Sequence, residues 1–351
     1  MTVENRIKVL VVDDSAIVRK VLTDALGCES DIEVVGTAPD PFVARDKILS
    51  LNPDVLTLDI EMPRMDGLTF LKKVMHYHPM PVIVISSLGV ASSRAALEAL
   101  GAGAIDVLAK PGGPQSVGEL RLSLASKIRA AKVARLSTPA SRIATPAPSP
   151  VRPAGQSFPT SAVIAIGAST GGTEAIQNVL IELPENCPGI VITQHIPAVF
   201  SRSFANRLNE RCAIRVREAE DGDRVEPGLA LVAPGNFHML LRRGPAGYRV
   251  EIKDGPMVCF QRPAVDVLFH SVAQAAGPNA TAAILTGMGS DGAMGMLAMK
   301  KSGARTIAQD EATCVVFGMP KEAIRQGAVD RVLPLSEIPG AILAESARLQ
   351  R

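Results

Sequence analysis

The sequence predicts two α/β domains, each built on a parallel β-sheet, with a linker between them. Its 351 residues exceed the usual length of a single domain. Short segments rich in Val, Ile and Leu recur in both halves without clean polar alternation, which is typical of strands buried on both faces. Helix-like segments lie between them. We therefore expect a first domain at 1–130, a linker at 131–160 and a second domain at 161–351.

The first domain is expected to be doubly wound, with five strands and five helices in alternation. Strands are expected at 7–12, 32–37, 54–58, 82–86 and 104–108. Helices are expected at 16–26, 41–49, 67–76, 91–100 and 116–131. Ser15 can cap the first helix, and Asp66 before Gly67 opens the third.

A proline-rich stretch follows the first domain. Six prolines lie between residues 136 and 160 among Ser, Thr and Ala, and such a stretch cannot hold a helix. From Arg121 to Thr160 there are seven Lys or Arg and no acidic residue. A nucleic-acid-binding arm is the alternative, but the basic residues are dispersed and no aromatic residue lies between them. A solvated linker is the favoured interpretation.

The second domain is again expected to be a doubly wound α/β domain. Strands are expected at 162–167, 189–194, 229–233, 248–253, 281–286 and 304–308. Helices are expected at 172–182, 200–210, 264–276, 292–301 and 319–326. An antiparallel hairpin is expected at 238–253, with its turn at 242–248.

Composition and charge exclude several classes of protein. No apolar run approaches the roughly 18 residues of a membrane span, and the N-terminus lacks a signal peptide, so we expect no membrane insertion. Five scattered cysteines without a CxxC pair indicate reduced thiols and a cytoplasmic location. The net charge is +2, and the second domain carries 19 basic and 19 acidic residues. This balance argues against a nucleic-acid partner.

Charged side chains end three of the strands expected in the first domain. Asp13 and Asp14 follow the first strand, Asp59 ends the third and Lys110 follows the fifth. In a parallel sheet these ends share the carboxyl edge, where α/β proteins bind ligands. Three crowded carboxylates repel one another unless a cation intervenes, so the pattern predicts a divalent metal. Lys110 adds a positive charge suited to an anionic group, as on a phosphorylated carboxylate.

A nucleophile motif begins the second domain. Residues 167–171 (GASTG) match the G-x-S-x-G pattern, in which glycines allow a sharp turn that lifts the Ser169 hydroxyl above the sheet edge. The helix that follows points free N–H groups at the same place. A glycine-rich phosphate or dinucleotide loop is the alternative, but its glycine spacing differs from the spacing found here.

A base and an acid follow the next strands of the same domain. His195 comes directly after the strand at 189–194, adjacent in sequence to the Ser169 strand, so both side chains should lie on one edge. Asp291 lies in a loop with four glycines after the strand at 281–286 and can orient an imidazole. The alternative is that Asp291 caps the helix starting near Gly292, and the two roles are compatible.

These motifs together resemble one family, the protein-glutamate methylesterases of bacterial chemotaxis (CheB). The first half resembles a receiver domain of two-component signalling at Asp13, Asp14, the run 59–67, Ser86 and the pair Lys110-Pro111. The second half resembles the methylesterase at residues 166–172 (IGASTGG), 193–197 (TQHIP), 285–292 (LTGMGSDG) and 316–320 (VFGMP). The resemblance covers the chain outside the linker.

For the first domain, the resemblance implies that Asp59 accepts a phosphoryl group from the chemotaxis histidine kinase. It implies that Asp14, Asp59 and the carbonyl of Glu61 hold Mg²⁺, with Asp13 contributing directly or through water. No cofactor is implied for ester hydrolysis.

The resemblance also implies how the phosphoryl group is bound and signalled. Ser86 would hydrogen-bond it and Lys110 would pair with it. Receiver domains often carry an aromatic residue three positions before the lysine, and this chain has Val107 there. The relay is therefore expected to depend on Ser86 and helix repacking.

For the second domain, the resemblance implies hydrolysis of γ-glutamyl methyl esters on chemoreceptors, and deamidation of glutamine by the same chemistry. Ser169 would attack the carbonyl and His195 would move its proton. Backbone N–H groups near Thr170 and Met288 would stabilise the oxyanion. The unphosphorylated receiver would restrain the esterase.

Two other classes of protein remain as alternatives. In the first, a receiver is fused to a non-catalytic binding module in which Ser169 is only a loop residue. In the second, the chain is a DNA-binding regulator, which the neutral second half disfavours.

Overall fold

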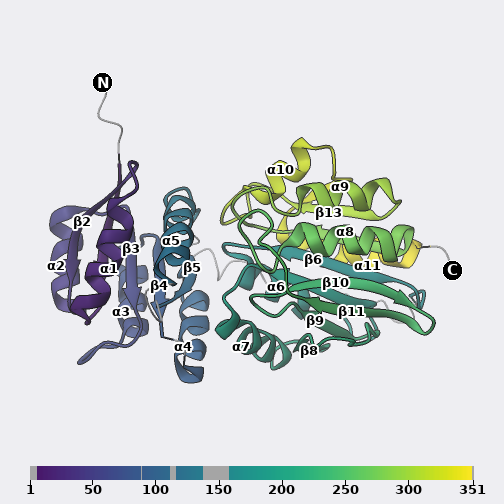
Figure 1. Ribbon diagram of the computed structural model, residues 1–351, viewed down its shortest axis with the longest axis horizontal. Coiled ribbons are helices and arrows are strands. Elements are labelled where there is room, and N and C mark those ends of the chain that lie inside the picture. The colour runs from purple at the N-terminus through teal and green to yellow at the C-terminus, as the bar shows by residue number, and fades with distance from the viewer. Residues whose placement is uncertain (1–5, 88, 111–115, 137–157, 350–351) are drawn as a thin grey trace. The chain divides into compact units, whose positions relative to one another are not determined.

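The computed structural model describes residues 6–87, 89–110, 116–136 and 158–349 and divides the chain into two compact units (Figure 1). The N-terminal unit is Met1–Pro146 and the C-terminal unit is Ala147–Arg351. The proline-rich residues 137–157 lie outside the described part of the chain. The expected linker at 131–160 therefore stays a prediction.

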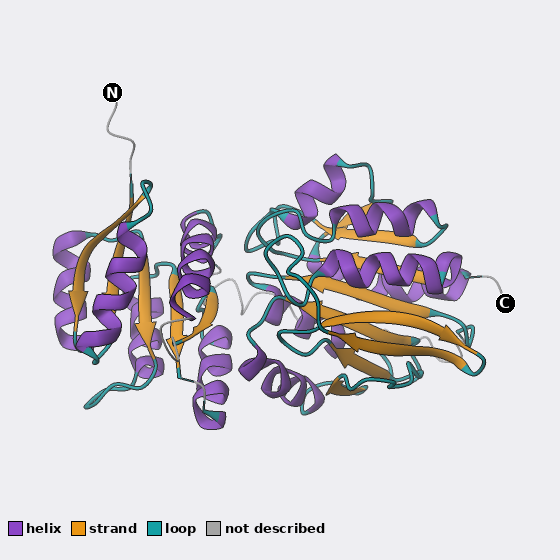
Figure 2. Ribbon diagram, in the orientation of Figure 1, coloured by secondary structure: helices purple, strands orange, loops and turns teal. Residues whose placement is uncertain are grey.

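The N-terminal unit is a five-stranded parallel sheet with helices between successive strands (Figure 2). Its strands are β1 (Ile7–Val12), β2 (Ile32–Ala38), β3 (Val55–Asp59), β4 (Val82–Ser86) and β5 (Asp106–Ala109). Its helices are α1 (Ala16–Gly27), α2 (Pro41–Leu51), α3 (Gly67–Tyr77), α4 (Val90–Gly101) and α5 (Ser116–Lys132). The strand order β2-β1-β3-β4-β5 is that of a doubly wound fold with its switch point at β1 and β3. This confirms the expected fold class.

Local side chains decide where three helices of this unit begin. Ser15 Oγ accepts the Val18 N–H at the start of α1. Asp40 accepts two N–H groups at the start of α2, and Asp66 accepts the Thr69 N–H at 2.8 Å at the start of α3. Each side chain satisfies a backbone donor that the first helical turn leaves free. The caps expected at Ser15 and Asp66 are confirmed.

The C-terminal unit is built on a seven-stranded parallel sheet with the order β14-β13-β12-β6-β7-β9-β8. Its strands are β6 (Val163–Ala168), β7 (Gly189–Gln194), β8 (Arg215–Glu218), β9 (Leu229–Val232), β12 (Ala280–Ile284), β13 (Arg305–Gln309) and β14 (Arg331–Leu333). Its α-helices are α6 (Gly172–Ile181), α7 (Ala198–Asn209), α8 (Val265–Ala275), α9 (Ala293–Lys301), α10 (Met319–Arg325) and α11 (Ile338–Arg348). Two short 3₁₀ helices lie at Gly277–Asn279 and Leu335–Glu337.

An antiparallel hairpin is added to this sheet, as the sequence predicts. Strands β10 (His238–Gly244) and β11 (Gly247–Lys253) pair with Gly244 opposite Gly247, which leaves two residues in the turn. The short edge strands β8 and β14 and the helix α11 lie outside the segments we expected. The edge strands are three or four residues long and partly charged, so they lack the apolar run that marks a buried strand.

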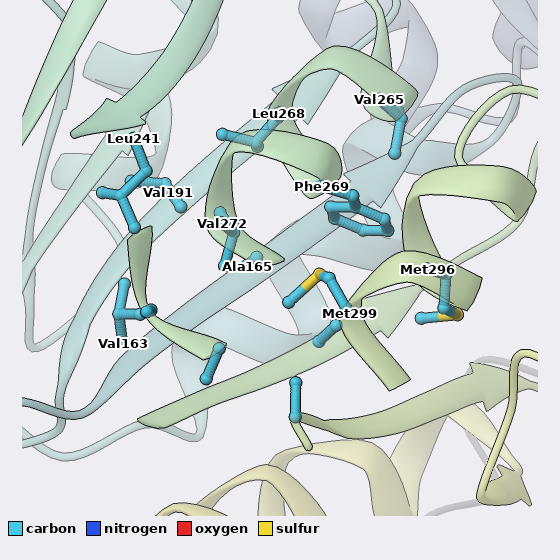
Figure 3. Packing of buried hydrophobic residues seen from close by; sticks show 14 of the residues in the cluster. Val163, Ala165, Val191, Leu241, Val265, Leu268, Phe269, Val272, Met296 and Met299 are labelled. Atoms are coloured by element: carbon cyan, nitrogen blue, oxygen red, sulfur yellow. The ribbon is translucent and has the colours of Figure 1, made fainter. Parts of the chain in front are cut away.

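The hydrophobic core of the C-terminal unit lies between the sheet, the hairpin and the helices α8 and α9. Figure 3 shows Val163 of β6 and Leu241 of β10 near the aliphatic side chains of α8, with Phe269 at the centre of the cluster. Along β6, Ile164 and Ile166 alternate with Val163 and Ala165. All four side chains are fully buried, so β6 is covered on both faces. Burying one such side chain contributes about 1.5–3 kcal/mol.

Helix α8 approaches β6 unusually closely. A Cβ on Gly167 would lie 2.3 Å from Cγ1 of Val265, the first residue of α8, so only glycine fits there. The close contact holds the N-terminus of α8 at the carboxyl edge of the sheet, where β6 ends and Ser169 follows. No helix in the described ranges is long and apolar enough to span a membrane.

Candidate active site and phosphorylation site

The carboxyl edge of the N-terminal sheet gathers the charged side chains that the sequence predicts. Lys110 Nζ lies 3.0 Å from Oδ2 of Asp13 and 2.8 Å from Oδ2 of Asp59. Both aspartates are fully buried, whereas Asp14 is exposed. Because β1 and β3 are neighbours in the sheet, their ends bring Asp13 and Asp59 together from positions 46 residues apart in the sequence.

Burial perturbs the charges at this edge. Burial raises the pKa of Asp59 to about 6, assisted by the charge of Asp13, while Lys110 and the Glu61 N–H act in the opposite direction. Burial alone would lower the pKa of Lys110, but hydrogen bonds and charges from Asp59 and Asp13 raise it above its usual value. One ammonium therefore faces two buried carboxylates and does not neutralise both.

The donor set at this edge fits a hard divalent cation. One carboxylate oxygen each from Asp13, Asp14 and Asp59 lies within 4.8 Å of the others. Such oxygen ligands are preferred by Mg²⁺. The carboxylate of Glu61 is outside this group, and only its backbone carbonyl was expected to be a ligand. The Glu61 N–H donates to Asp59 Oδ1 at 3.1 Å, which keeps Glu61 beside the cluster.

Ser86 lies at the end of β4 and is held by the segment that follows. Its hydroxyl donates to the Ser92 carbonyl at 3.2 Å. The Glu61 carboxylate accepts hydrogen bonds from Ser87 Oγ, at 2.5 Å, and from Ser92 Oγ. These hydrogen bonds lower the pKa of Glu61. Glu61 thus ties the loop after β3 to the start of α4. Val107 is buried within β5, at the position where an aromatic residue is common.

In the C-terminal unit, Ser169 and His195 follow neighbouring strands. Ala168 of β6 pairs with Gln194 of β7, so the next residue of each strand is Ser169 or His195. The His195 N–H donates to the Ala168 carbonyl at 3.1 Å, and the Ser169 N–H donates to the Thr286 carbonyl at 3.0 Å. Ser169 and His195 are each 7% exposed. The strand register therefore places both side chains at one buried edge.

His195 binds Asp291 across 96 residues of sequence. His195 Nε2 lies 2.7 Å from Asp291 Oδ2, and both side chains are buried. The other ring nitrogen, Nδ1, is buried without a hydrogen-bond partner among the described residues. If Nε2 carries the proton shared with the carboxylate, Nδ1 presents a lone pair. The imidazole is thus oriented to accept a proton at Nδ1.

Asp291 is a helix cap, but not of the helix that the sequence suggested. Its carboxylate accepts the N–H of Val265 at 2.7 Å and of Asp266 at 2.9 Å, both in the first turn of α8. The helix that follows Asp291, α9, has Gly292 at its N-cap and no side-chain cap there. The alternative that Asp291 caps the helix starting near Gly292 is wrong, because its carboxylate is directed across to α8. The same carboxylate oxygen that binds His195 also accepts the Val265 N–H.

Glycines bring the loops of the site close to Ser169. A Cβ on Gly287 would lie 2.7 Å from Cβ of Ser169, so the chain before Met288 passes directly beside the serine. Gly171 has φ 76° at the N-cap of α6, a left-handed conformation that glycine adopts without strain. These two approaches bring Thr170 and Met288 to the same region as Ser169. The turn expected around Ser169 is confirmed by the change from β6 to α6 between Ala168 and Gly172.

Some polar residues of the site were not predicted. Gln194 Nε2 donates to the carbonyl of Ser169 at 2.8 Å, so it holds the turn that carries the serine. Thr286 Oγ1 donates to the Thr170 carbonyl at 3.0 Å and binds both backbone groups of Val316. Gln194 ends β7 and Thr286 lies two residues after β12, so both are at the carboxyl edge that carries the predicted site residues, which is the signal that would have found them.

Two other polar residues, His238 and Asp266, form hydrogen bonds within the fold near the site. His238, one of five histidines, accepts the Ala264 N–H and contacts the Pro256 carbonyl, so both ring nitrogens are used within the fold. Asp266 in the first turn of α8 accepts the Gly295 N–H at 2.6 Å. An acid in the first turn of a predicted helix was its only sequence signal.

Comparisons with known proteins agree with this arrangement. A family model for the CheB methylesterase matches residues 164–342, and a model for the response regulator receiver domain matches residues 9–120. A relative from Anaeromyxobacter dehalogenans, named protein-glutamate methylesterase/protein-glutamine glutaminase 4, is 59% identical over 341 residues, or 96% of this chain and 94% of the relative. A relative from Salmonella typhimurium, named protein-glutamate methylesterase/protein-glutamine glutaminase, is 54% identical over 343 residues, or 97% of this chain and 97% of the relative.

A solved structure agrees as well. The crystal structure of the Thermotoga maritima CheB methylesterase catalytic domain is 39% identical, with a TM-score of 0.52, covering 53% of this chain and 99% of that chain. Its fold therefore corresponds to the C-terminal unit alone. Together with relatives that match nearly the whole length, these findings show that the chain belongs to the CheB family of protein-glutamate methylesterases/protein-glutamine glutaminases, with a receiver domain before the methylesterase domain.

Proposed function

We propose that this chain hydrolyses glutamate methyl esters on chemoreceptors, and deamidates glutamines there, with Ser169 as nucleophile and His195 as base. The observation that carries the proposal is the orientation of His195. Its Nε2 is bound to Asp291 at 2.7 Å, while Nδ1 is buried and has no hydrogen-bond partner among the described residues. A base held in this way takes the serine proton as the hydroxyl attacks the ester carbonyl.

The reaction proceeds through an acyl-enzyme. Attack by Ser169 Oγ forms a tetrahedral intermediate. Protonated His195 then gives its proton to the methoxy oxygen, which leaves as methanol, or to the amide nitrogen of a glutamine, which leaves as ammonia. Water, deprotonated by His195, attacks the acyl-enzyme and releases a glutamate carboxylate. Asp291 keeps the imidazole in one orientation and stabilises its charged form. No metal or cofactor takes part in these steps.

Backbone N–H groups of Thr170 and Met288 are proposed to stabilise the oxyanion. Thr170 directly follows the nucleophile and precedes Gly171, the N-cap of α6, where helical N–H groups face the sheet edge. Met288 follows Gly287, whose backbone lies against Ser169. Donors from these two segments of the chain would bind the oxygen as its charge develops.

The receiver domain is proposed to be phosphorylated at Asp59 by a chemotaxis histidine kinase. Asp13, Asp14, Asp59 and the Glu61 carbonyl would hold Mg²⁺, which supplies positive charge to the incoming phosphoryl oxygens. Lys110 supports this assignment, because it already contacts Asp59 at 2.8 Å and can pair with a phosphoryl oxygen. Ser86 would have to leave the Ser92 carbonyl to bind the phosphoryl group.

Phosphorylation is proposed to activate the esterase and so reset receptor sensitivity in chemotaxis, in the cytoplasm. We propose a receiver at 1–130, a linker at 131–160 and a catalytic domain at 161–351. The matches at 9–120 and 164–342 support this division because they leave the proline-rich stretch between them. A linker of this composition allows two domains to dock and separate.

The test is methanol release from methyl-labelled receptors by the phosphorylated full chain. Ser169→Ala should lower kcat by roughly 10⁶-fold, and Asp291→Ala by roughly 10⁴-fold, because an unoriented imidazole still acts occasionally. Ser290→Ala is the matched control, since Ser290 is exposed in the glycine-rich loop of the same site. Receptor binding should persist in Ser169→Ala. Hydrolysis at the wild-type rate by Ser169→Ala would show that Ser169 is only a loop residue, whereas receptor binding without hydrolysis by the wild-type chain would favour a non-catalytic binding module.

A further inference from the structure

The N-termini of α8 and α9 are capped by each other's acidic residues. Asp291, which precedes α9, accepts the Val265 and Asp266 N–H groups at the start of α8. Asp266 in turn accepts the Gly295 N–H, in the first turn of α9, at 2.6 Å. Each carboxylate satisfies donors that a first helical turn cannot satisfy internally, and each faces the positive end of the other helix.

Glycines allow the two helices to meet at this point. A Cβ on Gly295 would lie 2.9 Å from the Asp266 carbonyl oxygen and 2.7 Å from Cβ of Phe269. A Cβ on Gly292 would lie 2.6 Å from Cγ1 of Val265. With no side chain between the backbones, movement of the start of α9 moves Asp291 as well.

Asp266 has no obvious substitute in this position. It is 8% exposed and Asp291 is 2% exposed, so neither carboxylate is well solvated. Burial raises the pKa of Asp266, the Gly295 N–H lowers it, and the charge of Asp291 raises it further. Cys259 and His270 are the other titratable groups that act near it. Removal of the Asp266 side chain would leave the Gly295 N–H buried without this acceptor.

We infer that Asp266 is a positioning residue for catalysis: its hydrogen bond to Gly295 fixes the start of α9 and thereby holds the Asp291 carboxylate against Nε2 of His195. This inference rests on the proposed function of the same site. Asp266 itself is not proposed to contact the substrate or His195. It acts on kcat through the direction of Asp291, and substrate binding does not depend on it.

Three variants of the full chain test this inference. Asp266→Ala removes the acceptor, whereas Asp266→Asn keeps an amide oxygen that can accept the Gly295 N–H. Ser271→Ala is the control for a general loss of α8 packing. Ser271 is buried on the same helix, and its hydroxyl accepts the Leu241 N–H at 2.8 Å on the hairpin side, away from Asp291.

Asp266→Ala should lower kcat roughly 10- to 100-fold with KM unchanged, because the lost interaction concerns the reacting groups and not substrate binding. Asp266→Asn should recover most of that loss. Ser271→Ala should lower thermal stability but leave kcat near the wild-type value. A kcat within twofold of wild type for folded Asp266→Ala would overturn the inference, as would equal losses in the Ala and Asn variants.

A second readout does not depend on turnover. In chain labelled with ¹⁵N-histidine, the His195 Nε2 proton shared with Asp291 should give a low-field resonance, identified by its absence in His195→Gln. That resonance should shift or broaden in Asp266→Ala and persist in Asp266→Asn and Ser271→Ala. If it is unchanged in Asp266→Ala, Asp266 does not hold Asp291. If Ser169→Ala retains activity, the proposed function fails, yet this comparison still decides the role of Asp266.

Discussion

Burial disfavours the charged form of Asp59 in the N-terminal unit. It is fully buried, and its pKa of about 6 lies above the ordinary value of 3.8, first because of burial and then because of the Asp13 charge. Lys110 offsets only part of this effect. The residue proposed to attack phosphorus, which must be ionised to do so, is therefore kept at a cost in stability.

Metal-free Asp59→Asn should consequently be more stable than the wild type at pH 7–8. The pKa of Asp59 is raised from 3.8 to about 6 in the native state. The protonated side chain therefore favours the native state below pH 4, and this contribution to the free energy of unfolding is lost as the pH rises through 6 and the buried side chain ionises. The gain at pH 8 is about 3 kcal/mol at most, since each pKa unit is worth 1.36 kcal/mol. Urea unfolding of the N-terminal unit in EDTA measures it.

The same comparison at pH 4–5 should show a smaller difference between Asp59→Asn and wild type. Asp66→Asn is the control, because Asp66 caps α3 and backbone hydrogen bonds lower its pKa. Asp59→Asn should also take no label from a small phosphodonor with Mg²⁺. A pH-independent stability difference, or phosphate incorporated by Asp59→Asn, would contradict the account of this residue.

Among the structural elements, the start of α4 is tied to the loop after β3 by one side chain. Glu61 accepts hydrogen bonds from Ser87 and Ser92, while Ser86 donates to the Ser92 carbonyl. Position 107, where receiver domains often carry an aromatic residue, is a valine in this chain, so no aromatic side chain there can respond to a change at Ser86. The hydrogen bonds of Glu61 therefore connect the proposed phosphorylation site with α4 in this chain.

Glu61→Ala should loosen the start of α4. Loss of the two hydrogen bonds to a charged acceptor lowers the free energy of local opening by about 1–3 kcal/mol, or roughly 5- to 150-fold faster amide exchange there. Hydrogen exchange of the peptide that contains Ser92 and Ser93, in the unphosphorylated full chain, measures this change. Glu98→Gln is the control, because Glu98 pairs with Arg94 on the exposed face of α4. Equal exchange in Glu61→Ala and wild type would show that the tie does not hold the helix.

Local signals in the sequence were sufficient for the elements that carry the site. Buried strands of four to seven residues ended by Asp, Ser or His were visible as apolar runs, and the caps at Ser15 and Asp66 need only residues three positions away. The contact between Asp291 and the start of α8 could not be predicted from such local signals. The Asp291 carboxylate binds α8, which precedes it by some 25 residues, and the contact depends on how two helices cross. The edge strands β8 and β14 were missed because they lack an apolar run.

At the scale of the whole molecule, each unit has its own sheet and its own core. The C-terminal unit contains all seven strands of its sheet, the hairpin and the proposed residues Ser169, His195 and Asp291. Among the described residues, its helices and strands all lie between Val163 and Arg348. A fragment with residues 160–351 is therefore expected to fold by itself.

That fragment should hydrolyse receptor esters faster than the unphosphorylated full chain. The restraint expected in this family would be absent, and a coupling of 1–3 kcal/mol corresponds to roughly 5- to 150-fold in rate. Methanol release by equal concentrations of the two proteins measures the difference, and circular dichroism confirms that the fragment is folded. Phosphorylated full chain should approach the rate of the fragment. A folded fragment that is slower than the unphosphorylated chain would make the receiver an activator.

The five cysteines have a practical consequence for observing that process. None of them forms a disulfide, and Cys28 in the N-terminal unit and Cys259 in the C-terminal unit are exposed. Burial raises the pKa of Cys187 to about 12 and of Cys212 to about 11, which keeps both thiols protonated and slow to react. Alkylating dyes or spin labels would thus attach first to Cys28 and then, more slowly, to Cys259, whose own pKa is raised by burial and by two neighbouring carboxylates. The natural chain therefore carries one attachment point per unit, a built-in pair for measuring the distance between its two halves before and after phosphorylation.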